Sequence, residues 1–282
     1  MDLKGKTVSI LGDSISTYTD QSNGAAADTA NSTIRNNALY YAPGTWGVYL
    51  EDTWWHKAFA RLGLTLLVNN SWSGSCLLHP RYGTVGAYQD RCVQLHNDYT
   101  GEEPDHIAIF MGTNDYSYFG TTLGTAEAID YDSLIIESPE GTIYREPTTS
   151  CEAYAIVLDK IRKRYPKAEV HCMSLLPRRE NNPEGWHQPV SFNQSLAAIN
   201  DRFGCQTVDL YTDGISPSEE IFDTYFADRR LHPGVKGMAF IASRFAEALE
   251  QKKQTLFCHE KIDKRNQWCY NKQIEDSLSQ ER

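Results

Sequence analysis

Short apolar runs alternate along the chain with longer amphipathic stretches. Each apolar run is five to seven residues long and rich in Val, Ile or Leu, which is typical of buried strands. These runs occupy residues 7–11, 65–69, 106–111, 169–175 and 206–210. In the stretches between them, apolar residues recur at helical spacing, which predicts helices over residues 53–62, 151–165 and 191–203, and a last helix after Pro233. One buried stripe of that last helix is predicted to consist of Val235, Met238, Ile241, Ala242, Phe245 and Leu249.

This alternation of strands and helices predicts a three-layer α/β/α sandwich with a central parallel sheet of about five strands. Two stretches break the alternation, residues 18–46 and 116–150, and the second contains LIIESPEGTIYRE, which predicts a hairpin turning at residues 139–141. We interpret both stretches as loop insertions over one rim of a single domain spanning residues 1–250. Residues 251–282 form a polar tail.

The net charge, the apolar runs and the cysteines of the chain argue against several kinds of partner and location. The chain has 282 residues and a formal net charge of −10, so it repels nucleic acid and anionic membrane surfaces, and we expect neither as a partner. Its apolar runs are too short to span a bilayer and none precedes the first strand, which leads us to expect a cytoplasmic protein. Seven scattered cysteines without a CxxC pair argue against a disulfide framework and a structural zinc site.

Polar motifs follow the ends of the first three predicted strands. Gly12-Asp13-Ser14 ends the first, Asn70 to Gly74 follows the second, and Gly112-Thr113-Asn114-Asp115 follows the third, while Asp228 and His232 precede the last helix. In an open parallel sheet the ligand crevice lies beyond the carboxyl ends of the strands. All four motifs are therefore expected at one rim.

These residue types suit acyl transfer. A serine hydroxyl must lose its proton to a base as it attacks, and a third group must hold that base in the right tautomer. Ser14 is the candidate nucleophile, His232 the base and Asp228 the group that orients it. The oxyanion that then forms requires N–H donors, for which the candidates are the backbone of Ser14 and Gly74 and the side-chain amide of Asn114.

The ordered set GDS, SGS around Gly74, GTND and a late His-Pro resembles the SGNH, or GDSL, hydrolase family over residues 7 to about 250. The resemblance implies a flavodoxin-like sheet and a serine esterase, lipase, thioesterase or carbohydrate deacetylase. It also implies that Ser14 is the nucleophile and that Ser14, Gly74 and Asn114 bind the oxyanion.

One position departs from the family pattern. The family's acid lies three residues before the histidine, where this chain has Arg229, whereas Asp228 lies four before His232. A carboxylate four residues away still reaches the ring if the segment is turn-like. Asp223, or a backbone carbonyl in a Ser-His dyad, remains an alternative partner for the histidine.

Our hypothesis is a serine hydrolase that cleaves an ester of a small acyl group, with carbohydrate deacetylation as its narrower version. The substrate is then a small acyl ester such as an acylated sugar, and no metal or organic cofactor is implied. An acyltransferase with the same triad and a non-catalytic binding protein derived from a hydrolase remain alternatives. The segments expected around the crevice are rich in aromatic residues, which are compatible with a sugar ring or an acyl chain. They are Tyr18, Tyr40, Tyr41, Trp46, Trp72, Tyr116, Tyr118 and Phe119, and Arg178 and Arg179 offer a site for a substrate anion.

Overall fold

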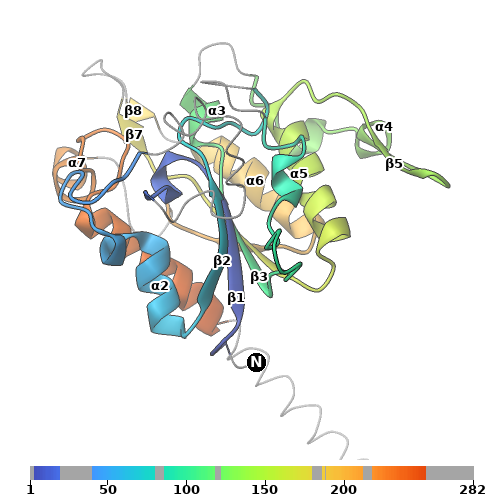
Figure 1. Ribbon diagram of the computed structural model, residues 1–282. Helices are drawn as coiled ribbons and strands as arrows, with labels where there is room; N and C mark the ends of the chain where they lie inside the picture. The colour runs from blue at the N-terminus through green and yellow to red at the C-terminus, as the bar shows by residue number, and fades with distance from the viewer. Residues whose placement is uncertain are drawn as a thin grey trace, which may run out of the picture.

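A parallel five-stranded sheet forms the centre of the molecule (Figure 1). The structure, a computed structural model, describes residues 3–19, 40–79, 86–117, 122–179, 186–187, 189–211 and 218–251. The strands of the sheet are β1 (Thr7–Gly12), β2 (Thr65–Ser71), β3 (His106–Phe110), β6 (Glu169–Met173) and β9 (Gln206–Val208), the five that the sequence predicts. Their order β2-β1-β3-β6-β9 is that of a flavodoxin-like sheet. The predicted fold class is confirmed.

Helices cover both faces of this sheet. The α-helices are α2 (Trp54–Leu62), α3 (Thr113–Ser117), α4 (Tyr131–Leu134), α5 (Ser150–Arg164), α6 (Val190–Arg202) and α7 (Glu219–Tyr225), followed by a helix over residues 235–251. Short 3-10 turns are η1 (Ser14–Ser16), η3 (Leu50–Asp52), η4 (Arg91–Val93) and η5 (Ala126–Ala128). The sequence did not predict α3, α4 or α7, because a helix of four to seven residues shows too little periodicity.

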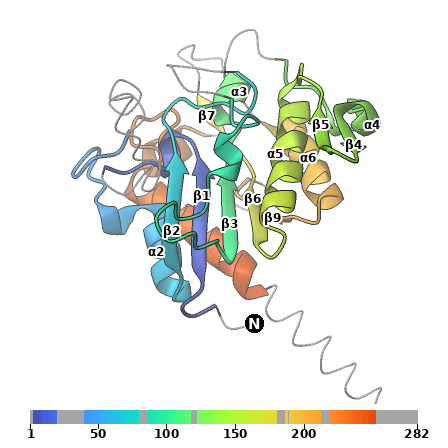
Figure 2. The ribbon, with the colours of Figure 1, turned by 45° about the vertical axis from the view of Figure 1, so that its right-hand side comes forward.

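Alternating side chains of the strands divide the core into two layers. On β3, Ile107 and Ile109 belong to the layer shared with α5 and α6, whereas Ala108 and Phe110 belong to the layer shared with α2 and the helix over residues 235–251 (Figure 2). The last helix buries its predicted stripe except at Val235, which is 38% exposed. Val235 is the first residue of this helix, so the buried stripe begins one turn later than predicted.

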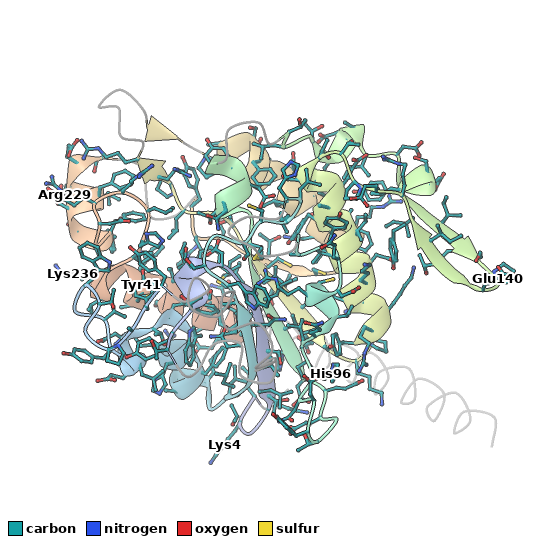
Figure 3. The ribbon with its side chains drawn as sticks, turned by 45° about the horizontal axis from the view of Figure 1, so that its top comes forward. Lys4, Tyr41, His96, Glu140, Arg229 and Lys236 are labelled. Carbon is teal, nitrogen blue, oxygen red and sulfur yellow. The ribbon has the colours of Figure 1, made fainter. Side chains whose placement is uncertain are left out.

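The predicted hairpin is present, but it lies beside the sandwich. Strands β4 (Ile135–Ser138) and β5 (Gly141–Tyr144) pair with a two-residue turn between them. Tyr144 Oη donates to Asp159 Oδ2 of α5 at 2.7 Å, and the hairpin extends outward from this helix (Figures 1 and 2). Figure 3 shows its tip at Glu140 on the side opposite Arg229. The hairpin therefore packs on a flanking helix and not over the rim that carries Ser14.

Several sequence predictions fall outside the described residues. These are Tyr118, Phe119, the greater part of the 18–46 insertion and the tail from residue 252 on. A second short pair, β7 (Arg178–Arg179) with β8 (Trp186–His187), lies beyond β6. None of the helices in the described ranges is long and apolar enough to cross a membrane.

Candidate active site

Ser14 stands at the sharp turn where β1 ends. A Cβ on Gly12, the last residue of the strand, would lie 2.5 Å from Ser71 Oγ, so only glycine fits there. Asp13 caps the following turn, since its Oδ1 accepts the N–H of Ile15 at 3.0 Å. Ser14 is the first residue of that turn and is only 3% exposed. The local sequence therefore fixes the nucleophile candidate deep in the rim.

The imidazole of His232 lies between Ser14 and Asp228. His232 Nε2 is 3.0 Å from Ser14 Oγ, and its Nδ1 is 2.7 Å from Asp228 Oδ2. Both distances are within hydrogen-bonding range, although Ser14 and His232 are 218 positions apart in the chain. With Nδ1–H donated to the carboxylate, Nε2 carries the lone pair that faces the serine hydroxyl. The structure thus brings together the three residues that the sequence proposed as a triad.

Asp228 is held in its ionised form. Its Oδ1 accepts the backbone N–H groups of Arg230, Leu231 and His232 at 2.9, 2.8 and 3.0 Å, and its Oδ2 faces the imidazole. Burial acts to raise the pKa of Asp228, but these hydrogen bonds and the charge of His232 outweigh it and lower the pKa to about 2. The carboxylate is therefore charged at neutral pH.

The extra residue before His232 is accommodated by a change in the backbone. Arg229 has φ of 55°, in the left-handed region, which displaces this one residue outward and leaves Asp228 facing the ring. The Arg229 side chain is 62% exposed and its Nε donates to Asp223 at 2.6 Å. Asp223, the alternative partner for His232, thus pairs on the surface with Arg229. Arg229 occupies the position at which the family has its acid.

The three oxyanion-hole candidates are linked through Ser75. Gly74 has φ of 73°, a conformation that favours glycine, and Ser75 follows it directly. Asn114 Nδ2 donates to Ser75 O at 2.9 Å, and Ser75 Oγ donates to Gly12 O at 3.3 Å. These contacts tie the segments that carry Ser14, Gly74 and Asn114 to one another.

The side chain of Arg91 binds the segments that carry Ser14 and Gly74. The sequence did not predict this role. The side chain is 1% exposed; its Nη1 donates to Gly12 O and Asn70 O, and its Nη2 to Ser75 Oγ, each at 3.2 Å. It therefore joins the ends of β1 and β2 to the segment after Gly74. Within YQDRCVQL, an arginine between polar residues resembles a surface residue, and no signal in the sequence indicates its burial.

Asp13, which is fully buried, is the carboxylate whose charge most affects Arg91. Burial raises the pKa of Asp13 to about 7, although the N–H of Ile15 and the charge of Arg91 both lower it. Burial likewise lowers the pKa of Arg91 to about 10, and the charge of Asp13 opposes this shift. Each group therefore depends on the other for its charge in the interior.

Replacing Arg91 by Met is expected to lower the free energy of unfolding by about 3 kcal/mol, because three acceptors lose a donor and Asp13 loses its neighbouring cation. Urea unfolding followed by circular dichroism measures this loss. The double variant Arg91→Met with Asp13→Asn is expected to cost less than the sum of the two single changes. Simple additivity would contradict the coupling of the two charges.

The other residues that the sequence placed around the substrate crevice lie partly in the core and partly at the surface. Tyr18 and Tyr41 are 5% and 0% exposed and pack in the core, and Tyr116 stacks on Phe192 at a centroid distance of 6.4 Å. Arg178 is buried, whereas Arg179 forms an ion pair with Glu219 at 2.9 Å. Arg179 is therefore engaged in a surface ion pair.

One group of side chains in the described part of the chain has the spacing of metal ligands, namely His106, Glu169 and His171, whose ligand atoms lie within 4.8 Å of one another. They lie where β3 and β6 begin, at the end of the sheet opposite Ser14. Gln206 Nε2 donates to a backbone carbonyl, so its Oε1 accepts from His171 Nδ1 at 2.9 Å. His171 Nε2 then accepts the hydrogen bond of His106 Nδ1 at 3.0 Å. The two imidazole rings are thus hydrogen-bonded to each other and to Gln206.

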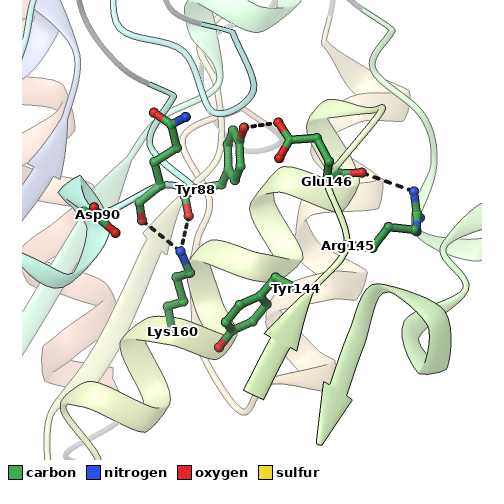
Figure 4. Close-up of a pocket in the computed structure, with 7 residues that line it drawn as sticks. Tyr88, Asp90, Tyr144, Arg145, Glu146 and Lys160 are labelled. Atoms are coloured by element: carbon green, nitrogen blue, oxygen red, sulfur yellow. Dashed lines mark hydrogen bonds between the residues drawn. The ribbon is translucent and has the colours of Figure 1, made fainter. Parts of the chain in front are cut away.

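A hollow of about 530 Å³ lies on the outer surface beside α5 (Figure 4). Its polar groups bind one another: Lys160 Nζ donates to the carbonyls of Tyr88 and Gln89 at 2.8 and 3.1 Å, and Tyr88 Oη donates to Glu146. Burial and the bond to Glu146 raise the pKa of Tyr88 to about 12. These contacts join α5 to the segment before η4 and are structural.

Comparison with known proteins gives a family match and matches among solved structures. The family GDSL-like Lipase/Acylhydrolase matches residues 6–212. A Bacteroides ovatus protein described as a GDSL-like lipase is 24% identical with a TM-score of 0.58, over 88% of this chain and 99% of that one. A Lactobacillus plantarum protein is 20% identical with a TM-score of 0.60, over 88% and 98% of the two chains. Curated protein sequences give no match.

Proposed function

The chain belongs to the GDSL-like lipase and acylhydrolase family and is an ester hydrolase, and from this premise we propose that it cleaves esters of small acyl groups, with acetylated carbohydrates as the substrate class. In this proposal Ser14 is the nucleophile, His232 the general base and acid, and Asp228 the group that orients His232. The backbone N–H groups of Ser14 and Gly74 and the amide of Asn114 form the oxyanion hole.

The reaction proceeds in two half-reactions. Ser14 Oγ attacks the ester carbonyl carbon while its proton passes to His232 Nε2. The carbonyl oxygen becomes an oxyanion that accepts hydrogen bonds from the N–H groups. The intermediate collapses, the C–O bond to the alcohol breaks, and His232 returns its proton to the departing alcohol oxygen. Water then attacks the acyl-enzyme with the same base, and the carboxylic acid and Ser14 are released.

One observation carries the proposal: Ser14 Oγ, the His232 ring and Asp228 form an unbroken hydrogen-bonded chain with lengths of 3.0 and 2.7 Å. Two further features support it. Asp228 is ionised throughout the working range of a histidine base, and it therefore stabilises the imidazolium that forms in each step. Ser14 is 3% exposed and Asn114 6%, so the nucleophile lies deep in the rim, which favours a small acyl group over a bulky one.

A fluorophosphonate probe tests the proposal directly, because only a serine activated by a base reacts quickly with it. We expect one covalent adduct per chain, and peptide mass mapping is expected to find it on Ser14. Labelling is expected to abolish acetate release from an acetylated methyl pyranoside. An adduct on another serine, or undiminished acetate release after complete labelling of Ser14, would refute the proposed mechanism.

A further inference from the structure

The ring of Tyr40 stacks on the imidazole of His232. The centroids are 3.6 Å apart and the planes differ by 12°. The backbone N–H of Tyr40 donates to Thr17 Oγ1 at 2.9 Å, and Thr17 Oγ1 donates to Ser14 O at 2.9 Å. The next residue, Tyr41, donates from Oη to Pro233 O at 2.7 Å. This pair of tyrosines is thus fixed both to the turn of Ser14 and to the loop of His232.

Trp46 extends this aromatic surface outward. Its indole Nε1–H donates to Tyr40 Oη at 3.1 Å, yet the residue is 54% exposed. The segment from Gly44 to Val48 forms a tight turn closed by backbone hydrogen bonds, including Gly44 N to Val48 O at 3.1 Å. A large apolar side chain is therefore held at the surface in a defined position beside the candidate active site.

Trp46 is exposed although its backbone also adopts an unfavourable conformation. Trp46 has φ of 53°, a conformation that non-glycine residues adopt at a cost of about 1 kcal/mol or more. Gly44 and Gly47 on either side also have positive φ, 80° and 74°. A glycine or asparagine at position 46 would relieve the strain, and a polar residue would avoid exposing the indole. Folding alone thus does not favour tryptophan at this position.

The proposed reaction indicates which part of the substrate lies near Tyr40 and Trp46. The departing alcohol takes its proton from His232 Nε2, so its oxygen lies beside the imidazole when the bond to the acyl carbon breaks. Tyr40 covers one face of that imidazole, and Trp46 is bonded to the outer end of Tyr40. An alcohol that extends from His232 along the Tyr40 ring is therefore directed toward the indole.

We propose that Trp46, held by Tyr40, forms a subsite for the alcohol part of the ester, and that this subsite takes a ring with an apolar face, such as a pyranose. The indole N–H is already bonded to Tyr40 Oη, so the indole offers a ligand its flat face and not a hydrogen bond. This inference rests on the proposed function, because it assigns a second part of the same substrate.

The test compares two acetate esters with different alcohols. The value of kcat/KM is measured for an acetylated methyl pyranoside and for ethyl acetate, whose alcohol is too small to reach Trp46. Trp46→Gly removes the ring and relieves the positive φ, so this variant is expected to fold. We expect the ratio of the two kcat/KM values to fall about 5- to 10-fold in Trp46→Gly and less than about 2-fold in Trp46→Phe.

Tyr99→Ala is the matched control, because Tyr99 is an aromatic residue 84% exposed in the turn that precedes β3, far from Ser14. Its ratio is expected to equal that of the wild type. Calorimetric binding of the pyranoside to Ser14→Ala, with and without Trp46→Gly, measures the subsite without chemistry and is expected to show a similar loss of affinity. An unchanged ratio and unchanged affinity in Trp46→Gly would overturn the subsite and leave the esterase standing. Failure of the wild type to hydrolyse either ester would overturn both proposals.

Discussion

Replacing Ser14 by Ala is expected to lower kcat for acetate ester hydrolysis by about 10⁵- to 10⁶-fold, because the acyl-enzyme no longer forms. Fold and stability are expected to change little, since Ser14 Oγ bonds to His232 in the candidate active site and the loss of one oxygen leaves the backbone of the turn unchanged. Acetate release measured at high enzyme concentration gives the residual rate, and thermal unfolding checks the fold. Hydrolysis at a tenth of the wild-type rate or more would remove Ser14 from the mechanism.

Ser16→Ala is a matched control from the same turn. Ser16 Oγ accepts the indole N–H of Trp54 at 3.1 Å and is fully buried, so it serves the core. The variant is expected to lose about 1 kcal/mol of stability and to keep the wild-type rate of hydrolysis. Loss of activity in both variants would indicate that damage to the turn, and not the missing nucleophile, explains the result.

Replacing Asp228 by Asn is expected to lower kcat about 10³- to 10⁴-fold, because the amide stabilises neither the required tautomer of His232 nor its imidazolium. Acetate release measured from pH 5 to pH 9 gives the loss. Asp223→Asn is the matched control: Asp223 pairs with exposed Arg229, and its replacement is expected to leave kcat within about 2-fold of the wild type. A large loss in Asp223→Asn alone would exchange the roles of the two carboxylates.

Asp228→Asn also tests how the stability of the protein depends on pH. The folded-state pKa of Asp228 is about 2, below its ordinary value of 3.8, so its ionised form stabilises the fold above pH 4. This contribution of about 2 kcal/mol decreases as the pH falls through 2. The difference in unfolding free energy between wild type and Asp228→Asn is therefore expected to shrink as the pH falls below 4. A difference that grows as the pH falls from 4 to 2 would contradict the assignment.

The sequence determined the sheet and the position of the rim. Apolar runs separated by helical stretches allow few arrangements other than parallel strands with crossover helices, and the carboxyl ends of parallel strands meet at one edge. Ser14, Gly74 and Asn114 follow three such strands, so their gathering at one edge follows from local pattern and topology. His232 followed from its place directly before the last helix.

Only the tertiary structure decided which groups surround these residues. The choice between Asp228 and Asp223 depends on the left-handed backbone of Arg229, which spacing alone does not reveal. The burial of Arg91 and the stacking of Tyr40 on His232 are contacts between segments distant in the chain, and their side chains carry no periodic signal. Periodicity records which face of an element is buried, whereas the partner of a single polar or aromatic side chain is set by packing.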